Sequence, residues 1–369
     1  MKIAIVHDYI KEYGGAERVL EELIKIFPQA HVYTTIFLPE YLGPHRERFE
    51  KYDIRTSFLQ YIPFNAKLIS PLRLFSPFAF KSFDLSSYDV IIVSQTGAYF
   101  PNLVRKTKDQ KLICYTHTPP RYLYGYATAR EVKSGLVKFI SHIVFHFLRM
   151  VDFKSSENVD QFIANSQEVK GRIEKFYRRD AVVIYPPVEA TSSKANSSKL
   201  EAKSYFLTGG RLARAKGTNI IVDAFIKNKK PLKIFGRGFA GFENELKTKV
   251  QGQKTNIEFV GEVTDEEKFE LMANAKAFIF ASYDEDFGIT PVESMGVGTP
   301  VIAYKSGGVK ETVEDRISGI FYDKNTPESL DNAIEKFESM RFETAKVKKT
   351  AEKFSAKEFD RKIKEIVNA

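Results

Sequence analysis

Short apolar runs recur along the chain, and most of them end in polar or glycine-containing turns. In the first half they lie at residues 2–6, 32–37, 88–94, 111–116, 162–166 and 182–188. In the second half they lie at residues 205–209, 233–238, 257–261, 277–281 and 300–304. Runs this short and continuously apolar are typical of parallel strands that are buried on both faces. Helical stretches alternate with them, so the pattern predicts an α/β fold with doubly wound sheets.

The β-α repetition occurs twice, on either side of a polar segment without hydrophobic periodicity. A chain of 369 residues is also too long for one ordinary core. We therefore predict a Rossmann-like domain over residues 1–188, a linker or boundary loop over 189–204, a second Rossmann-like domain over 205–350 and a charged helix over 351–369. The two domains are expected to face each other across a cleft, because open α/β sheets bind ligands at the carboxyl ends of their strands.

The composition is ordinary for a soluble globular protein, with 43% hydrophobic and 28% charged residues. A single cysteine, Cys114, excludes an internal disulfide and a thiolate metal cluster, and it fits a reducing cytosol. The first residues lack the features of a signal peptide. No run of about 18 uncharged apolar residues occurs, so no spanning helix is expected. We expect a cytoplasmic protein that can be peripheral on the inner face of the plasma membrane.

The net charge of +9 is concentrated in the first half, where residues 1–187 hold 26 Lys and Arg against 19 Asp and Glu. No nucleic-acid-binding module accompanies it, so nucleic acid is not expected as a partner. Residues 58–83 mix aromatic and basic side chains with prolines, which favours either contact with an anionic membrane or a loop folded onto the first domain. A solvated basic surface without a partner is the third interpretation. Residues 131–151 form an amphipathic stripe (Leu136, Ile140, Ile143, Phe147 and Met150) that predicts a core or interface helix.

The richest stretch for chemistry runs from Ser282 to Pro300. The apolar run 277–281 stops at a cluster of acids, a glycine turn follows, and a helix then begins, with Thr290 as its expected N-cap and Pro291 at its first position. Free N–H groups at a helix N-terminus bind anions, and Glu285 and Glu293 flank this site. An anion site beside two carboxylates suits a ligand with both phosphate and hydroxyl groups, such as a nucleotide sugar.

A second basic turn follows the strand at 205–209, with Arg211 and Lys216 between glycines. Two cations on a closely approaching backbone can clamp a diphosphate, although a solvated turn would show the same pattern. Asp284 and Asp286 form an Asp-x-Asp triplet that could hold a divalent ion. Because these cations and the helix N-terminus already supply positive potential, we expect no metal and no other cofactor.

Two features of the first domain point to the same kind of site. Gly14 and Gly15 open a helix after the first strand, either to approach a phosphate or sugar, or because a tight turn there needs positive φ. His117 follows the strand at 111–116 and precedes two prolines, which stiffen the turn and hold it at the edge of the sheet. A histidine in that position is a candidate for direct contact with a ligand.

Taken together, these residues resemble the family-4 retaining glycosyltransferases of the GT-B fold. The resemblance covers nearly the whole chain and rests on four ordered features: the 14–17 glycine loop, the 115–121 segment, the 209–217 basic turn, and two glutamates eight residues apart. Residues 306–311 with Gly319 also resemble the family's segment after its acidic motif. The combination of residues 7–9 with 285–293 is most similar to bacterial mannosyltransferases of O-antigen and related polysaccharides.

The resemblance implies a role for each matching position. Glu285 would bind donor-sugar hydroxyls near the amides of Phe287, Gly288 and Ile289, and Glu293 would hold the ribose. Arg211 and Lys216 would neutralise the diphosphate, while Val260 and Gly261 would line the base pocket. The Gly14–Gly15 loop would border the phosphates and acceptor, His117 would contact the donor sugar, and the last helix would return to the first domain.

The activity that this implies is transfer of mannose from GDP-mannose to a saccharide acceptor during cell-surface polysaccharide synthesis. The acceptor is expected to be polyprenyl-linked. A UDP-sugar donor stays open, because no residue pattern reveals the base. Two further functions also stay open, namely a nucleotide-sugar epimerase on the same fold and a non-catalytic protein that binds a sugar nucleotide.

Overall fold

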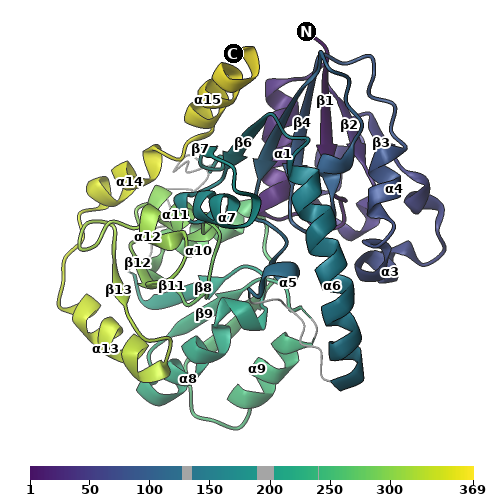
Figure 1. Ribbon diagram of the computed structural model, residues 1–369. Coiled ribbons are helices and arrows are strands. Elements are labelled where there is room, and N and C mark those ends of the chain that lie inside the picture. Colours follow the sequence, from purple (N-terminus) through teal and green to yellow (C-terminus); the bar gives the residue numbers. More distant parts are fainter. Residues whose placement is uncertain (127–134, 189–202, 240) are drawn as a thin grey trace. The chain divides into compact units, whose positions relative to one another are not determined.

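The computed structural model describes residues 1–126, 135–188, 203–239 and 241–369, and the chain forms two compact units (Figure 1). The first unit contains the described residues of Met1–Tyr126, Val132–Pro187 and Ala356–Ala369. The second contains those of Val188–Ser355. Of the expected linker, residues 189–202 lie outside the described part of the chain.

A seven-stranded parallel sheet forms the centre of the first unit, in the order β3-β2-β1-β4-β5-β6-β7. Its strands are β1 (Ile3–His7), β2 (His31–Thr34), β3 (Ile54–Thr56), β4 (Val90–Gln95), β5 (Lys111–Thr116), β6 (Gln161–Ala164) and β7 (Ala181–Val183). The order reverses between β1 and β4, and the carboxyl ends of these two strands therefore mark the ligand-binding edge of a doubly wound sheet. The pattern did not predict β3, because this strand has three residues and is only partly buried.

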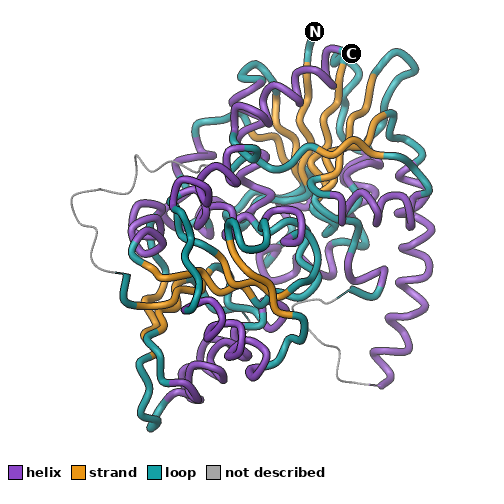
Figure 2. The backbone as a smooth tube through the Cα atoms, turned by 90° about the vertical axis from the view of Figure 1, so that its left-hand side faces the viewer, coloured by secondary structure: helices purple, strands orange, loops and turns teal. Residues whose placement is uncertain are grey.

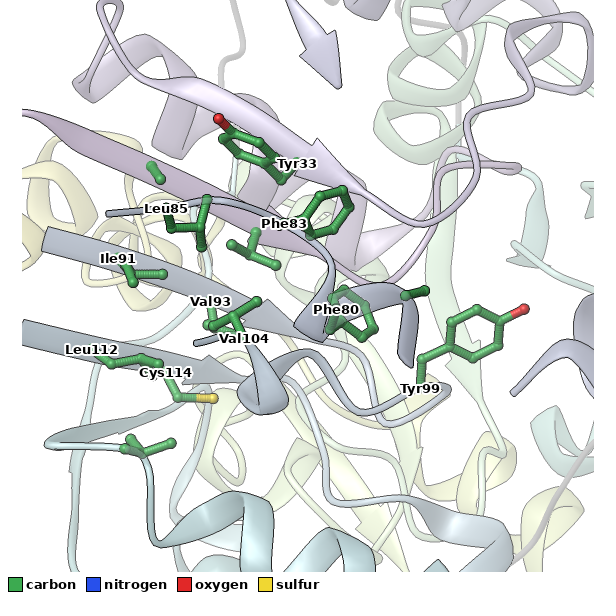
Figure 3. Close-up of a cluster of buried hydrophobic side chains, with 14 of the residues drawn as sticks. Tyr33, Phe80, Phe83, Leu85, Ile91, Val93, Tyr99, Val104, Leu112 and Cys114 are labelled. Atoms are coloured by element: carbon green, nitrogen blue, oxygen red, sulfur yellow. The ribbon is translucent and has the colours of Figure 1, made fainter. Parts of the chain in front are cut away.

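Apolar side chains at alternate positions pack on the two faces of this sheet. Figure 3 shows one core, in which Val93 and Cys114 lie with Tyr33 and Phe80. The other core takes in α1 (Gly15–Ile26) and α15 (Ala356–Asn368), so the end of the chain packs against α1 in this unit. The remaining helices of the unit, apart from those of residues 58–83, are η1 (Pro39–Tyr41), η2 (Gly43–His45), α2 (Glu47–Glu50), η4 (Pro101–Leu103), α5 (Arg121–Tyr124), α6 (Gly135–Ser156) and α7 (Gln167–Tyr177).

Residues 58–83 form helices that contribute to the core, and not the loop folded onto the first domain that was one of the two expectations. The helices are η3 (Phe58–Tyr61), α3 (Asn65–Leu72) and α4 (Ser76–Lys81). Leu59, Leu72 and Phe80 are buried, whereas Tyr61 and Phe64 are 81% and 75% exposed. Pro77 lies in the first turn of α4, where a missing N–H costs nothing, and Pro71 lies inside α3, one residue before that helix ends at Leu72. The segment therefore has one face in the core and one face in water.

The apolar stripe that predicted a core helix is turned outward in α6. Ile143, Phe147 and Met150 are 48%, 58% and 48% exposed. Leu148 is buried instead, in a small cluster with Phe100 and Leu123. The side chains of Leu136 and Ile140 lie outside the described part. Of the two expectations, a core helix is therefore wrong for the three described positions, because α5 and η4 pack against the neighbouring face of the helix, and an interface helix stays a prediction.

A six-stranded parallel sheet forms the centre of the second unit, in the order β10-β9-β8-β11-β12-β13. Its strands are β8 (Tyr205–Gly209), β9 (Leu232–Phe235), β10 (Ile257–Gly261), β11 (Ala275–Phe280), β12 (Val301–Tyr304) and β13 (Gly319–Tyr322). Its helices are η6 (Arg214–Lys216), α8 (Thr218–Asn228), α9 (Phe242–Val250), α10 (Asp265–Ala273), α11 (Ile289–Gly296), α12 (Val309–Thr312), α13 (Pro327–Glu338) and α14 (Thr344–Glu352).

Two groups of helices accompany this sheet: α8 packs with α9 and α13, and α11 packs with α10, α12 and α14. In Figure 2 the strands of each unit, drawn in orange, run side by side between helices. The doubly wound α/β class predicted from the sequence is confirmed for both sheets. In the part of the chain that the structure describes, each helix is too short or too polar to cross a bilayer.

Candidate active site

The candidate site of the second unit lies where the order of its sheet reverses, at the adjacent strands β8 and β11. The basic turn that begins at Gly210 follows β8, and the acidic loop that begins at Ala281 follows β11. Both strands are parallel, so their carboxyl ends meet at one edge of the sheet. The two motifs that the sequence separates by about 70 residues are therefore neighbours, at the position where doubly wound sheets bind ligands.

Glu285 and Lys216 form the centre of this site. The ammonium of Lys216 lies 2.5 Å from Oε2 of Glu285, and the hydroxyl of Ser282 donates to the same oxygen at 2.5 Å. The side chains of Lys216 and Glu285 are 37% and 18% exposed. Gly217 brings the turn this close, because its φ is +66° and a Cβ at this position would lie 2.3 Å from the carbonyl oxygen of Ala281.

A glycine-containing loop after β12 holds the acidic loop in place. The amide of Gly308 donates to the carbonyl of Glu285 at 2.7 Å, and the hydroxyl of Ser306 accepts from the amide of Asp284 at 3.1 Å. A Cβ on Gly307 would lie 2.2 Å from the carbonyl oxygen of Glu285, so only glycine allows this approach. The sequence marked residues 306–311 by resemblance alone, and the structure gives them a supporting position.

Helix α11 begins at Ile289 with Gly288 as its N-cap, which corrects the expected cap. Gly288 has φ +91°, in the left-handed region that suits glycine, and Thr290 is the second helical residue. Pro291 is the third, where its missing N–H is still harmless because the first turn has no intrahelical acceptors. α11 therefore starts two residues earlier than the sequence predicted, and the amides of its first turn directly follow Phe287 and Gly288.

Glu293 forms an ion pair that the sequence did not reveal. Its Oε1 accepts from Nζ of Lys268 at 2.8 Å, and the same ammonium lies 2.9 Å from Asp265. The side chains of Glu293 and Lys268 are only 2% and 8% exposed. Thr264 caps α10 through a reciprocal capping box with Glu267, which fixes the turn that carries Lys268. The i,i+3 spacing of Asp265 and Lys268 was visible in the sequence, but nothing linked either residue to Glu293.

The expected base-pocket residues and Arg211 occupy the same edge of the sheet. Gly261 ends β10, and its carbonyl accepts from the amide of Gly236 at 2.6 Å. A Cβ on Gly236 would in turn lie 1.9 Å from the carbonyl oxygen of Gly210. Val260 is half-buried beside Gly261. Arg211 follows Gly210 directly, and its guanidinium lies 6.0 Å from the ring centre of Phe239.

In the first unit, His117 belongs to a line of polar side chains across three strands. Nε2 of His117 lies 3.0 Å from Oγ of Ser94, and that oxygen lies 3.0 Å from Nδ1 of His7. The ring of His117 packs against Tyr115 at 5.1 Å between ring centres. Burial, together with the neighbouring His7, lowers the pKa of His117 to about 3, so its imidazole is neutral at physiological pH.

The glycine loop of the first unit opens α1 as predicted, but not through positive φ. Gly14 is the N-cap with φ −129° and ψ −160°, which is extended backbone. Its amide donates to Oε2 of Glu17 at 2.9 Å, and Oε1 of the same carboxylate lies 3.7 Å from Nε2 of His7. Gly15 is exposed. The tight-turn interpretation is therefore wrong, and the loop is tied to His117 through three intervening side chains.

Asp8 is a buried acid that was not among the predicted site residues. One of its oxygens, Oδ2, accepts from the hydroxyl of Thr96 at 2.5 Å and from the amides of Ala98 and Tyr99 at 3.0 and 3.1 Å. Burial raises the pKa of Asp8, and the three hydrogen bonds oppose that change. The acid fixes the loop after β4 against the end of β1. Its position directly after a buried strand was the signal that could have found it.

No cluster of three or more His, Cys, Asp or Glu side chains in the described ranges has the arrangement of a metal site. The residues that the sequence singled out divide between the units. His117, Gly14 and Gly15 belong to the first unit, and the others belong to the second.

Comparison with known families assigns both halves of the chain. Residues 13–192 match the profile of Glycosyltransferase Family 4, and residues 190–354 match that of Glycosyl transferases group 1. A solved structure of Anabaena Alr3699/HepE in complex with UDP and glucose superposes with a TM-score of 0.72 over 100% of both chains, at 20% identity. This likeness confirms the GT-B fold.

Curated relatives share somewhat higher sequence identity. The chain is 26% identical to the alpha-1,3/1,6-mannosyltransferase ALG2 of Dictyostelium discoideum, over 77% of this chain and 76% of that protein. It is 30% identical to the O-antigen chain mannosyltransferase RfbU of Salmonella typhimurium, over 53% of this chain and 57% of that protein. The chain thus spans between half and three quarters of the length of such relatives. The two family matches divide nearly the whole sequence between them, and the chain belongs to the family-4, group 1 glycosyltransferases with the GT-B fold.

Proposed function

We propose that the protein is a retaining glycosyltransferase that transfers mannose from GDP-mannose to a saccharide acceptor, as one step of cell-surface polysaccharide synthesis. The observation that carries the proposal is the Lys216–Glu285–Ser282 cluster, placed beside the N-terminus of α11 at the reversal point of the second sheet. The names of the mannosyltransferase relatives support the choice of mannose. We propose that the acceptor is polyprenyl-linked, because the first unit has the exposed apolar surface described below.

The cluster suits the junction between a sugar and a diphosphate. Lys216 places a cation next to the Glu285 carboxylate, so one group can face a phosphate oxygen while the other accepts from sugar hydroxyls. Arg211 and the first turn of α11, which includes Thr290, add positive potential on the phosphate side. Glu293, held by Lys268, would accept from ribose hydroxyls.

The proposed reaction exchanges one bond at the anomeric carbon for another on the same face. The bond from that carbon to the phosphate oxygen breaks, and a bond to the acceptor oxygen forms. The proton of the acceptor hydroxyl passes to the leaving phosphate oxygen, and the cations stabilise the charge that develops on the diphosphate. Neither a metal ion nor a second carboxylate at glycosidase spacing is needed for this balance.

The first experiment is a thermal-shift panel of GDP, UDP, ADP and TDP, followed by transfer assays with the matching sugar donors. A selective shift with GDP is the expected result. Lys216→Ala should lower turnover by about 10²-fold, since it removes a cation from the leaving group. Lys230→Ala is the matched control, because Lys230 also pairs with a carboxylate, at 2.7 Å from Glu338, but lies at the amino end of β9. Equal activity of the two variants would refute the assignment of Lys216.

The same assays distinguish two competing functions. A shift with UDP alone would replace GDP-mannose by a UDP-sugar, which agrees with the UDP complex of the Anabaena neighbour. Release of an epimer or free sugar without any acceptor would indicate an epimerase instead. Glu285→Gln separates enzyme from binding protein, because only an enzyme loses turnover while nucleotide binding persists.

We also propose that the first unit binds an anionic membrane through the outer faces of residues 58–83 and α6, which we call the aromatic face. Its exposed apolar side chains are Phe58, Tyr61, Phe64, Leu68, Leu74, Phe75, Phe78, Ile143, Phe147, Met150 and Phe153. The two parts are joined through Tyr122, whose ring lies 3.8 Å from the Arg73 guanidinium and 5.4 Å from the ring of Phe145. So many exposed large apolar residues on neighbouring elements are unusual for a surface that faces only water.

Charge selects lipid rather than a protein as the occupant of the aromatic face. Residues 58–83 contain no Asp or Glu, and the one acid of α6, Asp152, is buried, so the exposed charges of both parts come from Lys and Arg. Lys67 and Lys81 are exposed among the aromatic residues. Basic side chains attract anionic headgroups while aromatic side chains partition into the interface. Phe64 even adopts φ +60°, a strained conformation for a bulky residue, although its side chain is exposed.

Flotation with phosphatidylcholine vesicles tests this surface. One set of vesicles contains roughly 30% phosphatidylglycerol as an anionic lipid, and the other contains none. Phe64→Asn with Phe78→Gln should weaken binding by about tenfold or more, since burying one Phe contributes about 1.5–3 kcal/mol. Ile317→Gln is the control, because Ile317 is 44% exposed in the second unit. Equal flotation of wild type and the double variant would overturn the membrane proposal.

A further inference from the structure

The polar line that ends at His117 crosses adjacent strands of the first sheet. His7 ends β1, Ser94 lies opposite it in β4, and His117 follows β5. The Ser94 oxygen lies 3.0 Å from one nitrogen of each imidazole. His7 and Ser94 are fully buried, and His117 is 8% exposed. Of these three residues, His117 alone, which directly follows the carboxyl end of β5, has any exposed surface.

The opposite end of the line is set by Glu17. Nε2 of His7 is buried without a hydrogen-bond partner among the described residues, and Oε1 of Glu17 lies 3.7 Å from it. A carboxylate oxygen only accepts, so the ring nitrogen that faces it is the one that carries hydrogen. The other oxygen of Glu17 accepts from the amide of Gly14 and is therefore fixed by the glycine loop.

These contacts determine where each proton lies when both imidazoles are neutral. With hydrogen on Nε2 of His7, its Nδ1 is an acceptor and receives the hydroxyl hydrogen of Ser94. The Ser94 oxygen then accepts from Nε2–H of His117, which leaves Nδ1 of His117 without hydrogen. The reverse order would place a bare nitrogen of His7 against the Glu17 carboxylate, and two acceptors repel each other.

We propose that Glu17, His7 and Ser94 are positioning residues that hold His117 in the Nε2–H tautomer, so that its Nδ1 accepts a hydrogen bond from a hydroxyl of the donor sugar. The proposal rests on the proposed function, because it takes the donor sugar as the ligand of His117. It also gives the glycine loop a second role. The loop orients the Glu17 carboxylate, and the carboxylate sets the tautomer three side chains away.

Glu17→Gln gives the sharpest test, because the geometry dictates which end of the amide faces His7. The Gly14 amide requires an acceptor, so the Gln oxygen takes that position and the NH₂ group turns toward His7. His7 must then accept at Nε2 and donate from Nδ1 to Ser94, and the Ser94 hydroxyl must donate to His117. The order reverses along the whole line, and His117 is left with hydrogen on Nδ1.

Imidazole ¹⁵N NMR of the full chain without ligand reads the tautomer directly, since the sequence has six histidines and a His117→Gln spectrum assigns the signal. The Nε2–H form is expected in the wild type and in Glu22→Gln, the control on the same helix, whose side chain is also 13% exposed. Glu17→Gln should show the Nδ1–H form, and Ser94→Ala should show a mixture. An Nδ1–H wild type, or an unchanged Glu17→Gln, overturns the proposal.

Kinetics then separate this inference from the proposed function. With GDP-mannose as donor, Glu17→Gln should lower kcat/KM by about 3- to 10-fold, the range of one hydrogen bond, while the affinity for GDP is unchanged. If the tautomers behave as expected but His117→Gln leaves transfer unaffected, the line exists and the contact with the donor sugar is wrong. If GDP-mannose is not a donor at all, the NMR result still stands or falls by itself.

Discussion

The buried ion pair at Glu293 allows a quantitative prediction for Lys268→Met. Lys268 lies between two carboxylates, at 2.8 Å from Glu293 and 2.9 Å from Asp265, and the three side chains are between 2% and 13% exposed. The substitution keeps the length of the side chain but removes the cation. Two carboxylates then face each other in a region from which water is largely excluded.

The expected loss of stability follows from the burial of these charges. Removing one partner of a buried pair costs about 3–5 kcal/mol of unfolding free energy, because the remaining charge is buried without its cation. Glu293→Gln should cost less, about 1–3 kcal/mol, since Lys268 keeps Asp265 and the Gln oxygen can still accept from the ammonium. The double variant Lys268→Met with Glu293→Gln should lose about 0.5–3 kcal/mol less unfolding free energy than the two single losses added together.

Urea unfolding at pH 7 measures these differences by circular dichroism. The chain contains no tryptophan, so tyrosine fluorescence serves as a second probe. Two probes are needed because two units can unfold separately. Lys230→Met is the control, since its pair with Glu338 is 29% and 33% exposed and should contribute about 1 kcal/mol or less. A loss below about 1 kcal/mol for Lys268→Met, or strict additivity in the double variant, would refute the reasoning.

Three further predictions concern other positions. Burial raises the pKa of Asp152 from 3.8 to about 7, so its contribution to stability is full below pH 4 and is lost as the pH rises through 7. The free energy of unfolding of Asp152→Asn, relative to that of wild type, should therefore rise by up to about 3 kcal/mol from pH 5 to pH 8. Urea titrations at both pH values measure this difference. Phe64→Asn should raise the melting temperature slightly while it weakens flotation, because Asn tolerates positive φ better than Phe. Gly217→Ala should abolish transfer and lower stability, because the new methyl group would meet the Ala281 carbonyl at 2.3 Å, whereas Gly252→Ala, with open space, should change transfer little.

The sequence predicted the sheets and the loops at their carboxyl ends because both signals are local. A buried parallel strand has no polar face, so β1, β4, β5 and β11 stand out as apolar runs. A ligand loop must follow such a run directly, which located Glu285. The cap of α11 was misplaced because Thr290 and Pro291 fit the general residue preferences for a helix start. Gly288 is the actual N-cap and has a positive φ, which the sequence does not reveal.

The exposed faces were harder to predict, because periodicity identifies a stripe and not what covers it. The stripe of α6 has the spacing of a core face, yet the residues that pack are its neighbours, as Leu148 shows. In residues 58–83 the reverse holds, since Phe80 is fully buried within a segment that looks unsuited to a core. Tertiary packing decides both cases, and its partners come from α5, η4 and the first sheet.

The contacts that matter most for the candidate chemistry join residues far apart in the chain, and this changes how substitutions in the glycine loop should be interpreted. A variant of Gly14 that loses activity would ordinarily be assigned a lost contact with phosphate or acceptor. Yet the Gly14 amide also holds Glu17, and Glu17 faces the histidine that begins the line to His117. The same loss of activity therefore follows if the loop shifts and the proton order of that line changes. Only a measurement of the His117 tautomer in the variant distinguishes a loop that binds the ligand from a loop that prepares another residue to bind it.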